Sequence, residues 1–299
     1  VLVFYIGLTT AADPRLYLPL VVWYHVAFVL ITLEFWSLAN RLLNVRQGKR
    51  LFGLIGVGEI LAGIIGGLSV PLLVPLVSTP GLLIFSALGL LACLGVLVYI
   101  TRTFSRRISA PEEAEEEAVG GPADGLLKNR YFRFIIGVSV LSTLGFFMLD
   151  YVFYDLLETR YPTEDQIARF LGIFIAILGF INLFSNAFLH SRLIERYGLS
   201  LGLLAVPTMV AAGSIIALLA HLPGALILFF WVMVITKTFD EVTRTSIEEP
   251  SFRILYQPFP ALQRMRAQTL LETTVEPMAG ALAGAFLIVL TSYLAFETV

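Results

Sequence analysis

The sequence has 299 residues, of which 58% are apolar and 14% are charged, and its formal net charge is -2 at pH 7. Its mean hydropathy is +0.85, and its apolar residues fall in blocks longer than the core helices of a soluble domain. This composition excludes a soluble globular protein and predicts an all-α, polytopic membrane helical bundle. The charge balance gives no reason to expect nucleic acid as a partner.

Eight apolar blocks are each long enough to cross a hydrocarbon layer roughly 30 Å thick. They predict spans over 17–38, 51–74, 82–101, 132–155, 168–190, 200–219, 225–244 and 267–290. Residues 1–9 have the composition of the end of a further span. Because the chain starts at Val1 and its first apolar run lacks the basic flank and cleavage site of a signal peptide, we expect a fragment that lacks some helices.

The basic residues predict the orientation of these spans. If 17–38 runs inward, sixteen lysines and arginines lie in cytoplasmic loops and three lie in outside connections. Cationic loops resist translocation, so this asymmetry favours that orientation. The longest inside segment carries an acidic run, 112–117, whose composition cannot fold alone. We therefore predict a membrane half at 1–101, a cytoplasmic linker at 102–130 and a second membrane half at 131–299.

Two stretches that begin 217 residues apart share a pattern. Glu59 precedes Gly63 and Gly67 by four and eight residues, and Glu276 precedes Gly280 and Gly284 in the same way. On a helix, each acid shares a face with its glycines. Since an ionisable group in a span marks a functional site by default, Glu59 and Glu276 are predicted to bind substrate or a proton. The alternative is that they are protonated carboxyls that only hydrogen-bond a neighbouring helix.

A second pair of segments extends the repeat. Glu34 and Lys237 each lie seven residues before an arginine in the preceding spans. Parallel duplication of a six-helix unit is the plan of the major facilitator superfamily, which predicts two pseudosymmetric halves, here incomplete, with helices three to six and seven to eleven. We predict that Lys237 binds an anion or closes a cytoplasmic gate with Glu34. The alternative is a local ion pair of Lys237 with Asp240 and Glu241.

Further polar residues within or near the spans are secondary candidates for the site, each with a structural role as the alternative. They are Glu272, Asp150, Asn182 and Asn186. The three histidines lack metal-ligand spacing, so no metal site is expected. The sequence has no phosphate-binding loop, nucleophile elbow or Cys-x-x-Cys pair. We therefore expect neither an enzyme nor a cofactor, and energy from gradients or exchange.

Several motifs resemble the ATP/ADP translocase type of nucleotide carrier and its bacterial relatives. The first is Leu33-Glu-Phe-Trp-Ser-Leu-Ala-Asn40, followed by Gln47-Gly-Lys-Arg-Leu-Phe-Gly-Leu-Ile-Gly56. Others lie at 150–153, 168–174 and 255–260, with Arg264 and Arg266 after the last. The chain departs from the family at Pro277-Met-Ala-Gly280, where a Gly-Lys-Ser-like stretch is expected in the carriers. The missing lysine weakens the case for a polyanionic nucleotide.

The resemblance implies a secondary active transporter of the major facilitator type that exchanges a nucleotide or another organic anion by alternating access. It also implies a multi-pass protein of the bacterial inner membrane, in contact with membrane lipid. The alternative comes from another class: a membrane module that anchors or senses without moving solute. The resemblance allows for this as well, because relatives can be joined to cytosolic regulatory domains.

Overall fold

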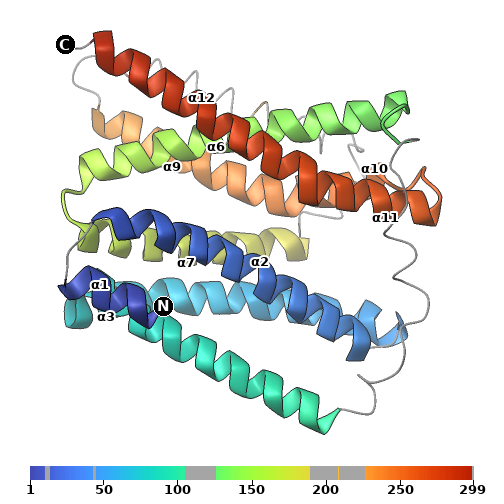
Figure 1. Cartoon of the computed structure of the whole chain (residues 1–299), viewed down its shortest axis with the longest axis horizontal. Coiled ribbons are helices and arrows are strands. Elements are labelled where there is room, and N and C mark those ends of the chain that lie inside the picture. The colour runs from blue at the N-terminus through green and yellow to red at the C-terminus, as the bar shows by residue number, and fades with distance from the viewer. Residues whose placement is uncertain (11–13, 43–44, 105–125, 189–207, 209–225, 298–299) are drawn as a thin grey trace. The chain divides into compact units, whose positions relative to one another are not determined.

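The computed structural model describes residues 1–10, 14–42, 45–104, 126–188, 208 and 226–297 (Figure 1). Its α-helices are α1 (Leu2–Thr10), α2 (Tyr17–Leu42), α3 (Val45–Thr103), α6 (Arg130–Arg160), α7 (Glu164–Phe188), α9 (Leu226–Thr243), α10 (Glu249–Leu255), α11 (Ala261–Leu270) and α12 (Glu276–Glu297). A short 3₁₀ helix, η1, covers Pro14–Leu16, and two π-helical turns are η3 (Arg244–Glu248) and η4 (Leu271–Val275). Every regular element within the described ranges is helical, so the predicted all-α membrane class is confirmed.

Five helical stretches of the described residues are long and apolar enough to cross a membrane. They are Tyr17–Trp36, Leu54–Thr103, Arg130–Arg160, Glu164–Ser185 and Gln263–Tyr293. Together they account for six of the eight predicted spans, because Leu54–Thr103 contains two. The span predicted at 225–244 is helical as α9, which carries three charged residues among its 18. The span predicted at 200–219 lies outside the described residues, apart from position 208.

The helix α3 is interrupted between its two predicted spans. Ser78 has φ 61° and ψ 170°, a left-handed φ that is uncommon outside glycine. Pro80 follows two residues later, and a proline lacks the backbone N–H that would bond to the carbonyl four residues earlier. The backbone N–H and the hydroxyl of Thr79 both donate to Asp165 Oδ1, at 2.9 Å and 2.6 Å. This side chain from the first turn of α7 therefore satisfies backbone that the interruption frees.

The chain forms two compact units, Val1–Glu112 with Tyr161–Phe180, and Glu113–Arg160 with Ile181–Val299. In the first unit, α3 packs closely on α7. A methyl group added at Gly67 would lie 2.5 Å from the carbonyl oxygen of Gly172, whereas one added at Gly63 would meet nothing within 4 Å. Of the two glycines that share a helix face with Glu59, only Gly67 makes this contact. The predicted division at 102–130 stays a prediction, since most of that linker lies outside the described residues.

In the second unit, the start of α6 packs against α10, α11 and η4. The buried cluster consists of Leu126, Phe132, Ile135, Leu255, Tyr256, Phe259, Ala267 and Leu271. The Tyr131 hydroxyl donates to the Leu255 carbonyl at 3.0 Å. Burial raises the pKa of the Tyr256 hydroxyl, and the charges of Glu272 and Glu276 act in the same direction. Further along, α12 crosses α6 where Gly280 faces Phe147, while a methyl group added at Gly284 would meet nothing within 4 Å.

Candidate functional site

A group of charged side chains joins α6 and α9 in the second unit. The Lys237 amine lies 2.5 Å from Asp150 Oδ1 and 2.7 Å from Glu241 Oε1, and its side chain is only 4% exposed. Asp240 Oδ2 is the third acid near this amine, at 3.7 Å. The predicted local pairing of Lys237 within α9 therefore exists, and Asp150 of α6 adds a partner from another helix.

Arg244 extends the group by one helical turn. Its guanidinium lies 3.7 Å from Asp240 Oδ1 and 3.4 Å from Glu248 Oε2. The Ser142 hydroxyl of α6 donates to Glu248, and Arg244 Nη1 donates to Ser142 at 3.4 Å. The charged residues of α9 and η3 recur every three or four positions, so a helix places them on one face. That face is buried against α6.

An aromatic ring lies between the two cations. The Lys237 amine is 4.2 Å from the centroid of the Phe146 ring, and the Arg244 guanidinium carbon is 4.5 Å from it. Each separation is short enough for a cation–π attraction, which strengthens where water is excluded. Phe146 thus contacts both cations beside α6 without adding a charge.

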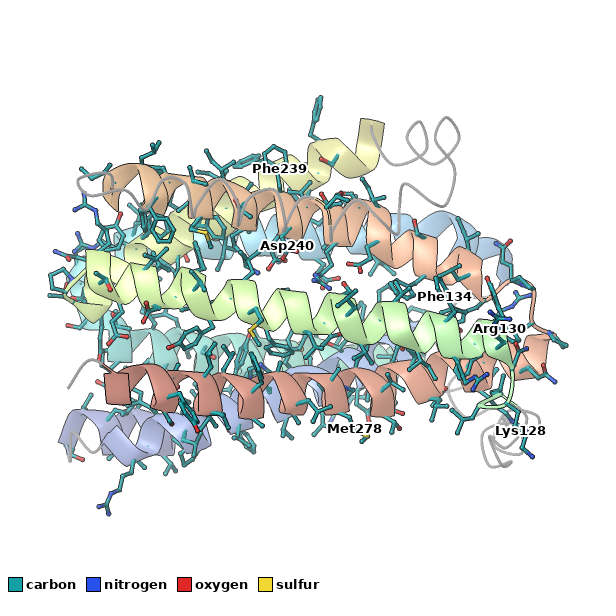
Figure 2. The ribbon with its side chains drawn as sticks, turned by 90° about the horizontal axis from the view of Figure 1, so that it is seen from above. Lys128, Arg130, Phe134, Phe239, Asp240 and Met278 are labelled. Atoms are coloured by element: carbon teal, nitrogen blue, oxygen red, sulfur yellow. The ribbon has the colours of Figure 1, made fainter. Side chains whose placement is uncertain are left out.

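The network contains more acid than base. Four carboxylates, from Asp150, Asp240, Glu241 and Glu248, surround the two cations. Figure 2 shows Asp240 on the side of α9 that faces α6, where it is fully buried, and Phe239 on the opposite side, where it is 53% exposed. Buried charges are stable only when paired, so these six side chains depend on one another.

The structure connects some of the other predicted site residues to this region. Glu276, at the start of α12, is half-buried and accepts a hydrogen bond from Ser139 of α6 at 3.1 Å. Asn182 accepts one from Thr245 at 2.9 Å. Glu272 is exposed on η4. Asn186 belongs to α7, but its side chain lies outside the described part of the chain.

Glu34 and Glu59 are in the first unit and are exposed on α2 and α3. Their environment differs from that of Lys237, which is buried, and of Glu276, which is half-buried. The equivalence of Glu59 with Glu276, and the gate between Glu34 and Lys237, stay predictions.

Sequence reasoning missed Arg244, Glu248 and Ser142 as members of the site. The signal for the first two was present: charges at 237, 240, 241, 244 and 248 keep the helical spacing of three or four. Ser142 had no such signal, because a serine in a span commonly bonds its own backbone. Among the described residues, no group of three His, Cys, Asp or Glu side chains could hold a metal ion.

Comparisons with known proteins point to one kind of relative. The chain is 20% identical, over 61% of its length, to ADP,ATP carrier protein 1 of Chlamydia muridarum, and 22% identical over the same share to that of Chlamydia trachomatis. It is 21% identical, over 90% of its length, to the plastidic ATP/ADP-transporter of Solanum tuberosum.

The chain spans 38% of the length of the chlamydial proteins and 47% of the plastidic one. No family model matches it, and no solved structure matches it. The residue motifs and the sequence relatives nevertheless agree, and the resemblance is confirmed: this chain is a distant relative of the ATP/ADP translocase type of carrier.

Proposed function

We propose that the protein is a secondary active transporter that exchanges an organic anion across the membrane, with a nucleotide of the ATP/ADP kind as the first candidate. The single observation that carries this proposal is the buried Lys237, which three carboxylates share. An intramembrane cation is costly to maintain and is normally kept for a substrate or ion path. The names of the relatives supply the substrate class.

The mechanism that follows is an exchange of partners. In the structure described here, Asp150 and Glu241 occupy the positions beside the Lys237 amine that a substrate oxygen would need. A phosphate or carboxylate of the substrate displaces them, and they return when it leaves. The cation keeps a partner throughout, and the two displaced acids are partly exposed, at 21% and 28%, so neither direction incurs the full penalty of an isolated buried charge. Two arrangements of similar free energy are what alternating access requires.

The net charge of the network limits how much negative charge a substrate can carry. Lys237 and Arg244 are already paired with four acids, and the stretch 277–280 contributes no further lysine. A polyanion such as ATP therefore needs cations from elsewhere in the full-length protein, or protons that enter with it. Glu276 and Glu59 are our candidates for proton binding. The rocking of two major facilitator-type halves, and residence in a bacterial inner membrane, are parts of this same proposal.

The test is exchange in proteoliposomes that contain the full-length protein, with labelled ATP, ADP and smaller organic anions, with and without a pH gradient. Lys237→Gln should abolish exchange. Glu241→Gln removes a competing carboxylate and should lower the half-saturation concentration for the substrate. Glu158→Gln, an exposed change on α6, is the matched control and should behave as wild type.

Two outcomes would count against the proposal. Wild-type exchange by a folded Lys237→Gln protein would remove Lys237 from the path. No exchange of any anion by the wild type would favour the anchoring or sensing alternative. Separately, a Glu59→Gln, Glu276→Gln double variant tests the proton sites. If its exchange and pH response matched those of the wild type, both acids would have only a structural role.

A further inference from the structure

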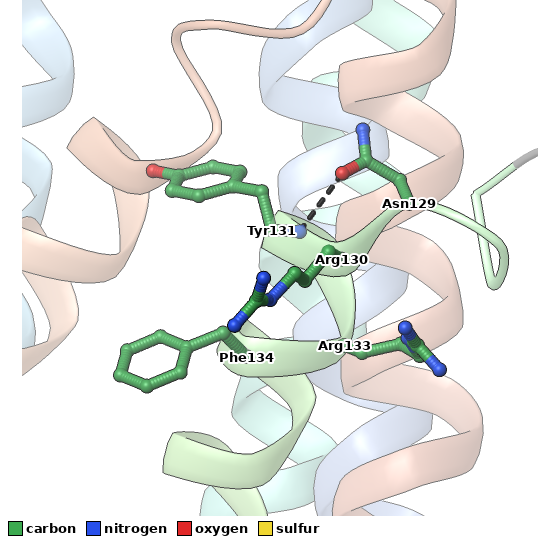
Figure 3. A pocket seen from close by; sticks show the side chains of 5 residues that line it. All are labelled: Asn129, Arg130, Tyr131, Arg133 and Phe134. Carbon is green, nitrogen blue, oxygen red and sulfur yellow. Dashed lines mark hydrogen bonds between the residues drawn. The ribbon is translucent and has the colours of Figure 1, made fainter.

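A basic and aromatic surface lies where α6 begins. Asn129, Arg130, Tyr131, Arg133 and Phe134 line a shallow, open hollow, with Lys128 just before them (Figure 3). Lys128, Arg130 and Arg133 are all exposed. These cations are separate from the buried network, and the exchange mechanism above does not use them.

Two hydrogen bonds hold the first turn of α6 in place. Asn129 Oδ1 accepts the backbone N–H of Tyr131 at 2.9 Å and so caps the first turn, where unpaired N–H groups favour an anion. The Tyr131 hydroxyl anchors the turn to α10 through the Leu255 carbonyl. In Figure 3, Arg130 and Phe134 point to one side of α6, and Arg133 points to the other.

The side that carries Arg130 continues as an apolar strip. Phe134, Gly137 and Leu141 follow at intervals of four, three and four residues, so they share a helix face with Arg130. Phe134 is 66% exposed and Leu141 is 64% exposed. A methyl group added at Gly137 would meet nothing within 4 Å. Gly137 therefore leaves a notch between the side chains of Phe134 and Leu141, on the helix face that also carries the Arg130 guanidinium.

We propose that this face binds one anionic phospholipid, with its phosphate on Arg130 and an acyl chain along Phe134, Gly137 and Leu141. Arginine is suited to a phosphate because its planar donors match the phosphate oxygens. Seven residues separate Arg130 from Gly137, which is about 10 Å along a helix and fits the step from a headgroup to its acyl chain. Arg133 and Lys128 add positive charge that attracts an anionic leaflet.

A lipid fits this face better than a soluble phosphate compound. A soluble anion would use Arg130 but would leave Phe134 and Leu141 uncovered. An acyl chain covers both and fills the space at Gly137. The site also agrees with the predicted orientation, because the start of α6 follows the linker that the basic residues place in the cytoplasm.

The experiment is native mass spectrometry of the full-length protein, titrated with phosphatidylglycerol or with phosphatidylcholine of the same acyl chains. The wild type should retain phosphatidylglycerol preferentially. Arg130→Gln should weaken that retention about fivefold, from about 1 kcal/mol per basic residue at an anionic surface. Arg160→Gln, an exposed arginine at the other end of α6, is the control and should have no effect.

A second variant separates the acyl contact from the charge. Gly137→Leu fills the notch and leaves Arg130 intact, so it should weaken retention of both lipids. Gly95→Leu, at an open glycine of α3, should not. Retention of phosphatidylglycerol that is unchanged in Arg130→Gln, or that excess inorganic phosphate abolishes, would overturn the lipid site. An unchanged thermal midpoint of each variant excludes misfolding as the cause.

Discussion

Where α3 and α7 approach most closely in the first unit, glycine backbone and apolar side chains meet, whereas the contact between α6 and α9 in the second combines apolar side chains with ion pairs. At the first, Gly67 lies against the backbone of Gly172, and Gly179 lies against Ile64. At the second, Asp150 and Lys237 meet inside a network of four acids. Both pairs bury a helix face, but they do so with different residues.

The two kinds of helix contact predict different mobility for the helices that they join. Two helix backbones in close contact have one favourable separation, because any gap forfeits dispersion energy. An ion-pair network allows a cation to exchange one acid for another, since three acids lie within 4 Å of the Lys237 amine. The glycine contact therefore suits a fixed joint, and the charged contact suits a part that moves or that receives a substrate.

Removing the central cation should have the largest effect. Lys237→Met leaves three acids without their shared partner, and breaking a buried pair in this way costs about 3–5 kcal/mol. The thermal midpoint in detergent should fall accordingly. Lys128→Met, at an exposed lysine, is the control. A midpoint as high as that of the wild type would show that the network does not hold α6 to α9.

The glycine contact should be the next most sensitive. Gly67→Leu places a side chain where a single methyl group would already lie 2.5 Å from the carbonyl oxygen of Gly172, and overpacking of this kind costs about 1–3 kcal/mol. Gly63→Leu, one turn earlier on α3 and facing open space, should be close to neutral. Equal thermal midpoints for the two variants would contradict the close approach of α3 and α7.

A smaller loss of stability is expected from a substitution of Ser142. Ser142→Ala removes a hydroxyl that donates to Glu248 and accepts from Arg244, and hydrogen bonds to charged groups contribute about 1.5 kcal/mol or more. Ser292→Ala, whose hydroxyl donates to the Ile288 carbonyl of its own helix, gives the baseline. The comparison of their unfolding midpoints tests whether α6 supports the charged face of α9 and η3.

The smallest effect should come from the interruption of α3. Thr79→Val removes the 2.6 Å hydroxyl bond to Asp165 but keeps the backbone bond, so the thermal midpoint should fall by less than it does in Ser142→Ala. Thr101→Val, at a threonine that bonds back along α3, serves for comparison. If Thr79→Val changed the midpoint no more than Thr101→Val, Asp165 would not brace the interruption through this side chain.

Much of the helical architecture could be predicted from hydropathy, because each span is a continuous apolar block. The charges at 237, 240 and 241 also predicted their local pairing, since helical spacing alone brings them together. The partnership of Lys237 with Asp150 could not be predicted, because it depends on which face of α6 meets α9. The same limit applies to the glycines: equal spacing at 63, 67, 280 and 284 does not fix helix rotation, so only Gly67 and Gly280 meet close neighbours.

The two π-helical turns, η3 and η4, stand at either end of the segment 249–270. A π turn holds about one residue more than an α turn. If η3 or η4 relaxed to regular α geometry, the helix beyond it would rotate by roughly 100° about its axis. Ser142 and Ser139 of α6 bond Glu248 and Glu276, the acids at the far ends of the two turns. A one-residue change of register at η3 would therefore re-aim α10, and one at η4 would re-aim α12, so the hydrogen bonds from α6 to Glu248 and Glu276 hold both turns in their observed register.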